Sequence, residues 1–282
     1  MLSGIYDIHV HAYPSLIPRK YSLVELAKLA SEHQFAGILY YDHSYNTQPA
    51  VQIVNELGYP TKVYGSVMLN KACGGLSEEV VDTALKLGTK VISFPTYDTR
   101  AHFERMGHDF KRFPKSDSAK AFYLLDESGS LLPEVEKIIE MVAEKGAVLA
   151  SGHLSPEEDL EIARVAKRKG VKAFIINSVT TEGIRFSLEE QKVLATEGAY
   201  LEHTYMALTP YVNEQTPIEE IVEVIKTVGA ERCLVSTDSG QASNPDMVAG
   251  LHDFIDILQK NGVSDEEMEI MVKSNPKYIL ED

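Results

Sequence analysis

The sequence predicts an α/β fold of the (β/α)8, or TIM-barrel, class. Eight short apolar runs rich in β-branched and aromatic residues alternate with longer segments whose apolar residues recur with helical period. Each helical segment opens soon after a strand ends, as in right-handed βαβ units built on a parallel sheet. The length of 282 residues is also close to the ~250 residues typical of one such barrel.

The predicted strands cover residues 4–12, 36–44, 62–69, 90–96, 147–154, 172–179, 199–207 and 233–240. Eight strands in a chain of this length fit a closed barrel better than an open sheet. No linker rich in Pro, Gly or Ser divides the chain, so residues 1–282 are expected to form a single barrel domain.

Local signals mark where the predicted helices begin and end. A Ser or Thr followed three residues later by Glu predicts a capping box, in which each side chain bonds the backbone amide of the other residue. This pattern occurs at Ser155–Glu158, Ser187–Glu190, Thr216–Glu219 and Ser264–Glu267. Glycines that suit a left-handed helix end precede the next strand at Gly88, Gly146, Gly170, Gly198 and Gly229. The last two helices are expected at about 246–260 and 264–279.

One strand-to-helix connection is much longer than the others. More than thirty residues separate the strand that ends near Thr96 from the helix that starts near Pro133. Connections of this length usually act as lids or binding loops. The Phe-Tyr run before Asp126 and the turn at Gly129 predict a small hairpin inside this insertion after the fourth strand.

The charge and composition exclude several classes of partner. A formal net charge of −15 repels phosphate backbones and anionic lipid, so neither nucleic acid nor a membrane surface is an expected partner. No apolar run approaches the ~18 residues that span a bilayer, and the polar start predicts no signal peptide. Cys73 and Cys233 lie far apart in sequence and fit reduced thiols of a cytoplasmic protein. The expected partner is a small-molecule substrate, and homo-oligomer formation stays open.

A His-Val-His motif lies in the first predicted strand. Residues two apart in a strand point to the same face about 7 Å apart, so His9 and His11 can hold one cation between them. The alternative is a pair of core histidines, each hydrogen-bonded to neighbours. The surrounding segment YDIHVH is otherwise a buried apolar strand, where unsatisfied imidazoles are costly.

Further histidines follow other predicted strands. His43, His153 and His203 lie at or near strand ends, and His102 lies just beyond one. Asp238 ends the last strand, which lies next to the first in a closed barrel. Neutral imidazoles and a carboxylate are the ligands of zinc and related divalent ions. The sequence therefore predicts a metal centre on the rim where barrel enzymes place their chemistry.

These motifs resemble the amidohydrolase superfamily of metal-dependent barrel hydrolases. The matching features are an HxH pair on the first strand, a His on the fifth and an Asp on the eighth. The segments GSVMLN, GGLSEEVV, GHLSPEE and STDSGQASNP, with the PT pair before His102, are more closely similar to an uncharacterised family of amidohydrolase-like proteins. The resemblance runs through nearly the whole chain. It implies that His9, His11, His153 and Asp238 bind the metal and that Asp238 is also the general base.

The chain departs from the superfamily pattern at two strands. The fourth strand offers Thr96, Tyr97 and Asp98 where a bridging Lys or Glu is common, which favours one zinc ion rather than two. The sixth strand offers Asn177 in place of a His, so that ligand is missing or supplied by His203. Glu202, beside His203, is either a partner or ligand in the site or an ordinary polar strand end.

The resemblance implies a metal-dependent hydrolase that uses metal-activated water to cleave an amide, ester, lactone or cyclic imide bond. His43, His102 or His203 would stabilise the oxyanion, and Arg100 could hold a substrate carboxylate or lie on the surface. The alternatives are a metal-dependent decarboxylase of an aromatic acid and a catalytically silent barrel that binds a ligand. The substrate, the metal and its stoichiometry stay open.

Overall fold

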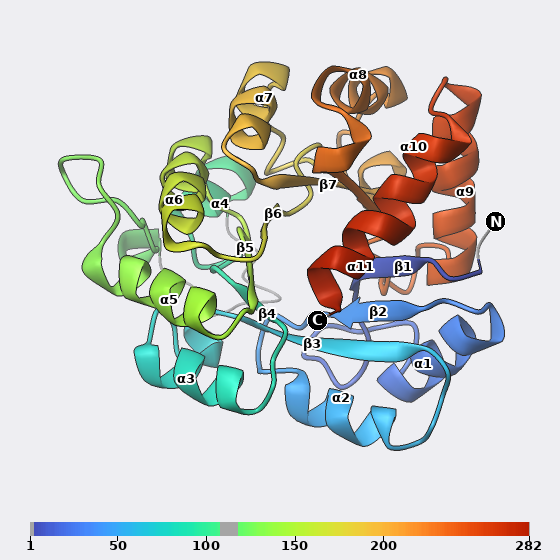
Figure 1. The fold of residues 1–282 in the computed structure, drawn as a ribbon, viewed down its shortest axis with the longest axis horizontal. Helices are drawn as coiled ribbons and strands as arrows, with labels where there is room; N and C mark the ends of the chain where they lie inside the picture. The colour runs from blue at the N-terminus through green and yellow to red at the C-terminus, as the bar shows by residue number, and fades with distance from the viewer. Residues whose placement is uncertain (1–2, 108–117, 282) are drawn as a thin grey trace.

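The computed structural model describes residues 3–107 and 118–281, and within them the predicted barrel is confirmed (Figure 1). Parallel strands follow one another in sequence order, each paired with the next. The ring is closed by a bridge between Val10 and Ser239 and by a hydrogen bond of 2.7 Å from the His11 amide to the Ser239 oxygen. The strands are β1 (Tyr6–Val10), β2 (Gly37–Tyr40), β3 (Lys62–Met68), β4 (Val91–Ser93), β5 (Val148–Ala150), β6 (Phe174–Ile176), β7 (Tyr200–Thr204) and β8 (Cys233–Ser236).

Helices surround the ring of strands (Figure 1). They are α1 (Leu23–Glu32), α2 (Gln48–Asn55), α3 (Glu78–Lys86), α4 (Arg100–Met106), α5 (Pro133–Glu144), α6 (Pro156–Lys169), α7 (Leu188–Thr196), α8 (Ile218–Val228), α9 (Met247–Lys260), α10 (Asp265–Glu269) and α11 (Asn275–Leu280), with a π-helical segment at Ile270–Ser274 between the last two. Among the described ranges, no helix combines the length and the apolar character that crossing a bilayer requires.

Three of the four predicted capping boxes are present. Ser155, Ser187 and Ser264 cap α6, α7 and α10, each with its Glu partner three residues on. The prediction at Thr216 is wrong: α8 begins after Pro217, and the Thr216 hydroxyl instead donates to the backbone oxygen of Thr180. That hydroxyl is buried, and a carbonyl from the loop after β6 satisfies it.

The long connection after β4 contains more structure than the sequence predicts. It begins with α4, which the sequence reasoning did not foresee, while the predicted hairpin is confirmed by a bridge between Leu125 and Leu131 around a turn at Asp126. Residues 108–117 in the middle of the predicted insertion, with His108, lie outside the described residues.

The inside and the outside of the barrel carry separate apolar layers. Leu39, Tyr41 and Met68 belong to a buried cluster that fills the ring. Ile38 and Tyr40, their neighbours on β2, pack with the surrounding helices instead. Side chains of α11, including Ile279 and Leu280, join the interior cluster beside Tyr6 at the start of β1. The C-terminal helix therefore closes the end of the barrel at which β1 starts, and the opposite end stays available for a pocket.

Gly240 supports a close approach at the seam of the barrel. Its φ of 137° is unfavourable for residues with a side chain, and a Cβ there would lie 2.3 Å from the His11 backbone oxygen. We expect Gly240→Ala to lower the free energy of unfolding by about 3 kcal/mol, because it adds a backbone clash to the dihedral strain. The measurement is urea unfolding.

Gly198→Ala is the control, because Gly198 has a φ of 98° but nothing within 4 Å of its added Cβ. It should cost about 1–2 kcal/mol, from the dihedral angle alone. Equal losses for the two variants would show that contact at the seam adds no constraint.

Candidate functional site

A bulge in β1 directs the two histidines toward one point. The pairing of β1 with β2 shifts register between Asp7 and Val10. Ile8 packs in the interior cluster, yet His9 also faces the pocket at the mouth of the barrel. A bulge adds one residue to a strand and re-aims a side chain in this way. The two-residue spacing then brings His11 to the same side.

The carboxylate of Asp7 stabilises this bulge. Its Oδ1 accepts hydrogen bonds from the backbone amides of His9 (3.2 Å) and Thr237 (3.1 Å), and its Oδ2 accepts one from the Thr237 hydroxyl (2.5 Å). Burial raises the pKa of Asp7 to about 7, although these hydrogen bonds act in the opposite direction. Asp7 therefore links β1, the strand of His9, to Thr237, which directly precedes Asp238.

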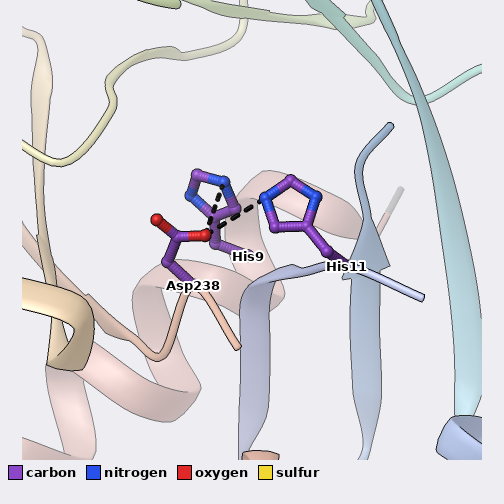
Figure 2. A group of neighbouring side chains, drawn as sticks. All are labelled: His9, His11 and Asp238. Atoms are coloured by element: carbon purple, nitrogen blue, oxygen red, sulfur yellow. Dashed lines mark ion pairs between the residues drawn. The ribbon is translucent and has the colours of Figure 1, made fainter. Parts of the chain in front are cut away.

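The side chains of His9, His11 and Asp238 converge as a triad, with one possible ligand atom from each residue and all of these atoms within 4.8 Å of one another. Asp238 Oδ1 lies 3.1 Å from His11 Nε2 and 3.8 Å from His9 Nε2 (Figure 2). Figure 2 also shows the second Asp238 oxygen directed away from both imidazoles. Asp238 has a φ of 51°, a left-handed conformation that Asp tolerates better than most residues.

Each histidine of the triad is held through its other ring nitrogen. His9 Nδ1 lies 3.1 Å from both carboxylate oxygens of Glu202, which can only accept, so this nitrogen carries the hydrogen. His11 Nδ1 lies 2.8 Å from the backbone oxygen of Tyr41, which likewise requires a donor. Both Nε2 atoms are thus left to face Asp238. Fixing a ligand imidazole through its second nitrogen is typical of metal sites in proteins.

Glu202 is the hub of a buried hydrogen-bond network. Its side chain has no exposed surface and also accepts from the Ser236 hydroxyl (2.7 Å), the Asn177 amide nitrogen (2.9 Å) and the Ser178 backbone amide (3.2 Å). The Asn177 side-chain oxygen accepts from the Gly152 amide. Both ends of the Asn177 amide are therefore occupied, and this residue serves as a support for Glu202.

The structure brings six of the predicted site residues to one pocket. His9, His11 and Asp238 form the triad, while His43, His102 and His153 line the same pocket of about 440 Å³. His153 Nδ1 lies 3.0 Å from His102 Nδ1, and within the described part of the chain His153 is not a member of the triad. Its predicted role as a ligand stays a prediction.

The structure does not bring His203 into the pocket. Glu202 points into the barrel, so its neighbour on β7 points outward, and His203 Nδ1 lies 3.5 Å from the Thr180 hydroxyl. Burial lowers the pKa of His203 to about 4. Asp98 is also engaged elsewhere, because its carboxylate accepts the Lys71 amide at 2.8 Å. The Thr96 hydroxyl forms a hydrogen bond of 3.1 Å with His43 Nδ1.

The sequence reasoning missed two charged residues of this site. Asp7 was read as part of an apolar strand, although a carboxylate beside two histidines was a usable signal. Arg19 gave no signal, because it lies in the irregular segment between β1 and α1. The structure places Arg19 in the pocket wall, buried to 6 % exposure, whereas Arg100 is exposed and stacks on the Tyr123 ring at 3.9 Å.

Burial keeps most pocket imidazoles neutral. It is the largest cause of the lowered pKa of His11 and His43, and the positive charge of Arg19 adds to it. The pKa of His153 is lowered by burial and by His102. His9 differs: burial opposes its protonation, but the carboxylates of Glu202 and Asp238 outweigh it and raise its pKa to about 9. Burial raises the pKa of Asp238, opposed by His9 and Arg19.

The fold and the pocket are those of a TIM barrel with two histidines and an aspartate gathered at its mouth. Solved structures share the barrel fold. The "amidohydrolase from Pseudomonas aeruginosa" is 12% identical with a TM-score of 0.69, covering 99% of this chain and 96% of the other. The "organophosphorus hydrolase from Deinococcus radiodurans" is 12% identical with a TM-score of 0.60, covering 99% and 92%.

A third structure, the "putative 2-pyrone-4,6-dicarboxylic acid hydrolase from Pseudomonas putida", is 14% identical with a TM-score of 0.62 and covers 99% of this chain and 98% of the other. No curated protein matches the sequence. A family model described as "family of unknown function (DUF6282)" matches residues 4–202. The chain belongs to this family, and its predicted likeness to amidohydrolase-type barrels and to an uncharacterised family is confirmed.

The Glu202 carboxylate should determine the protonation of His9. We expect Glu202→Gln to lower the pKa of His9 by roughly one to three units, because a neutral amide no longer stabilises the imidazolium. The measurement is an NMR titration of the His9 ring in metal-free protein.

Glu182→Gln is the matched control for this titration. Glu182 also lines the pocket, but its carboxylate bonds Asn213 and not His9. If both variants left the His9 pKa unchanged, the Glu202 contact would not be its cause.

Proposed function

We propose that this protein is a metal-dependent hydrolase that acts on an amide, ester, lactone or cyclic imide bond of a small molecule. The observation that carries the proposal is the convergence of His9 Nε2, His11 Nε2 and Asp238 Oδ1 while both Nδ1 atoms are engaged elsewhere. Asp238 Oδ1 is buried and has no hydrogen-bond partner among the described residues. An orphaned carboxylate oxygen facing the Nε2 atoms of two imidazoles fits a divalent cation, and the ligand types favour zinc.

The three triad residues would hold one zinc ion. When bound there, zinc supplies Lewis acidity, which polarises a carbonyl and makes water a nucleophile at neutral pH. The fourth strand adds no bridging carboxylate, because Asp98 is engaged with Lys71. This supports a site with one ion rather than two.

Asp238 is suited to the proton transfers of hydrolysis. Its Oδ1 faces the ligand nitrogens, and its other oxygen is directed away from them (Figure 2). That oxygen can take a proton from the attacking water and later give it to the leaving group. Burial raises the pKa of the Asp238 carboxyl, which brings its basicity closer to that of a general base at neutral pH.

Two further imidazoles in the pocket are available to the developing oxyanion. His43, which follows β2 and stacks on the His11 ring at 5.1 Å, and His102 on α4 both line the pocket, and burial lowers the pKa of His43. A neutral imidazole can donate one N–H to an oxyanion in a site that excludes water. His203 lies outside the pocket and is not part of this proposal.

Metal analysis of the purified protein and a substrate panel test the proposal together. About one zinc per chain, and hydrolysis of at least one lactone, ester, amide or cyclic imide, support it. Decarboxylation of aromatic acids without hydrolysis would replace it with the alternative chemistry. If the protein binds no divalent ion and added zinc changes neither its activity nor its stability, the hydrolase proposal is wrong. The catalytically silent, ligand-binding barrel is then the supported alternative.

Zinc binding should release a proton from His9. Because the His9 pKa is about 9 in the absence of metal, the imidazole is charged at pH 7, and zinc requires the lone pair that holds this proton. The apparent zinc affinity should rise about tenfold per pH unit from pH 7 and level off near pH 9. Competition titrations against a chromophoric chelator measure this slope. An affinity that does not change between pH 7 and 8 would contradict it.

Asp238→Asn should abolish turnover while the fold persists. An amide cannot accept the proton of water, so kcat should fall about a thousandfold or more on any substrate from the panel. Zinc content should fall as well, because an amide oxygen is a poorer ligand. Asp98→Asn is the matched control, a buried aspartate outside the pocket, and should keep wild-type activity. Full activity in Asp238→Asn protein would remove Asp238 from the mechanism.

A further inference from the structure

Arg19 is a buried cation in the wall of the pocket. Its residue exposure is 6 %, and its Nε and Nη2 atoms are buried and have no hydrogen-bond partner among the described residues. A buried guanidinium whose donors meet no acceptor loses its hydration without compensation. A molecule in the pocket that Arg19 lines can supply the acceptors that the described residues do not provide.

The pair of free nitrogens specifies the shape of the missing acceptor. The N–H bonds of Nε and Nη2 run parallel along one edge of the planar guanidinium. This edge matches the two oxygens of a carboxylate, which can accept both bonds at once. A single neutral carbonyl oxygen would satisfy only one of them well.

Backbone hydrogen bonds fix Arg19 relative to the triad. Arg19 forms an antiparallel bridge with Gln241, and the Lys20 amide donates to the Gly240 oxygen at 2.9 Å. The Lys20 ammonium also donates to the backbone oxygen of Asn244 at 2.7 Å. These contacts tie the segment after β1 to the loop that carries Asp238. The backbone that carries the Arg19 side chain is therefore positioned in advance of any ligand.

The net negative charge of the protein means that an anionic substrate needs a local positive group, and Arg19 is such a group in the pocket. At −15, the chain repels anions at long range. A surface of this charge favours neutral or cationic substrates unless a specific group in the pocket compensates. Among the charged residues that line the pocket, Glu182 is engaged with Asn213 and Asp238 belongs to the triad, so Arg19 remains available to an anion.

We propose that Arg19 binds a carboxylate group of the substrate, so that this site takes small carboxylic acids whose hydrolysable bond lies elsewhere in the same molecule. The proposal rests on the proposed hydrolase function for its substrate, and it narrows that function to anionic amides, esters, lactones or imides. Arg19 is then a residue that determines specificity and orientation.

Calorimetric titration with succinate and with its neutral analogue succinamide tests the anion site directly. The full chain is used with the metal that it carries, and metal content is measured for every protein. Wild-type protein should bind succinate at least about tenfold more tightly than succinamide, as expected for a charge-assisted bidentate pair. Equal binding of the two probes would overturn the proposal without recourse to any variant.

Variants of Arg19 assign this preference to one residue. Arg19→Gln should lose it, and Arg19→Lys should lose most of it, because an ammonium keeps the charge but not the paired donors. Arg100→Gln is the matched control, since this exposed arginine lies outside the pocket, and it should bind succinate as the wild type does. Undiminished succinate binding in folded Arg19→Gln or Arg19→Lys protein would overturn the proposal.

Kinetics on paired lactones separate this proposal from the hydrolase proposal. A five-membered lactone that bears a carboxylate should have a kcat/KM at least about tenfold above that of the unsubstituted lactone in wild-type protein, and this ratio should vanish in Arg19→Gln. Equal hydrolysis of both lactones would overturn the Arg19 proposal and support the hydrolase proposal. Succinate binding that depends on Arg19, without hydrolysis of any substrate, would overturn the hydrolase proposal and support the anion site.

Discussion

The Asp7 carboxylate links the two chain segments on which the candidate site depends. It accepts the His9 amide on β1 and both the amide and the hydroxyl of Thr237, 230 positions away in sequence. Closing the barrel brings its first and last strands together, and the triad residues lie in or directly after these strands. The position of Asp238 against His9 and His11 is therefore a property of the closed ring. A local error at this junction would separate the three triad residues even if every helix remained in place.

The surroundings of the triad give its three members different electrostatic properties. His11 is neutral because burial and nearby positive charge oppose its protonation, whereas His9 is held between two carboxylates and keeps its proton. Glu202 orients His9 and is itself satisfied by Ser236, Asn177 and Ser178. Without these donors, a fully buried carboxylate would be costly. The residues around the triad thus decide which imidazole nitrogen faces Asp238 and in which protonation state.

Much of the fold followed from local patterns, because strands, helix caps and the strand-helix alternation are written in short segments of sequence. The convergence of His9, His11 and Asp238 was also predictable, since strand ends share one rim in a parallel barrel. Which residues of β7 point into the barrel was not predictable. Glu202 and His203 are both polar, and sequence alone cannot decide which of two neighbours points inward. The β1 bulge was equally hidden, because an extra residue in a strand has no composition signal. Thr216 failed as a cap for a similar reason, since its acceptor on Thr180 is distant in sequence.

Because α11 closes one end of the barrel, it limits how small molecules can reach the triad. Ile279 and Leu280 pack against Tyr6 at that end, and the interior above them is filled by apolar side chains. Within the described residues, this packing gives no second way through the ring. A substrate would therefore enter and its product leave through the same opening, so product release has to precede the binding of the next substrate. The rates of both steps would fall if that opening became narrower.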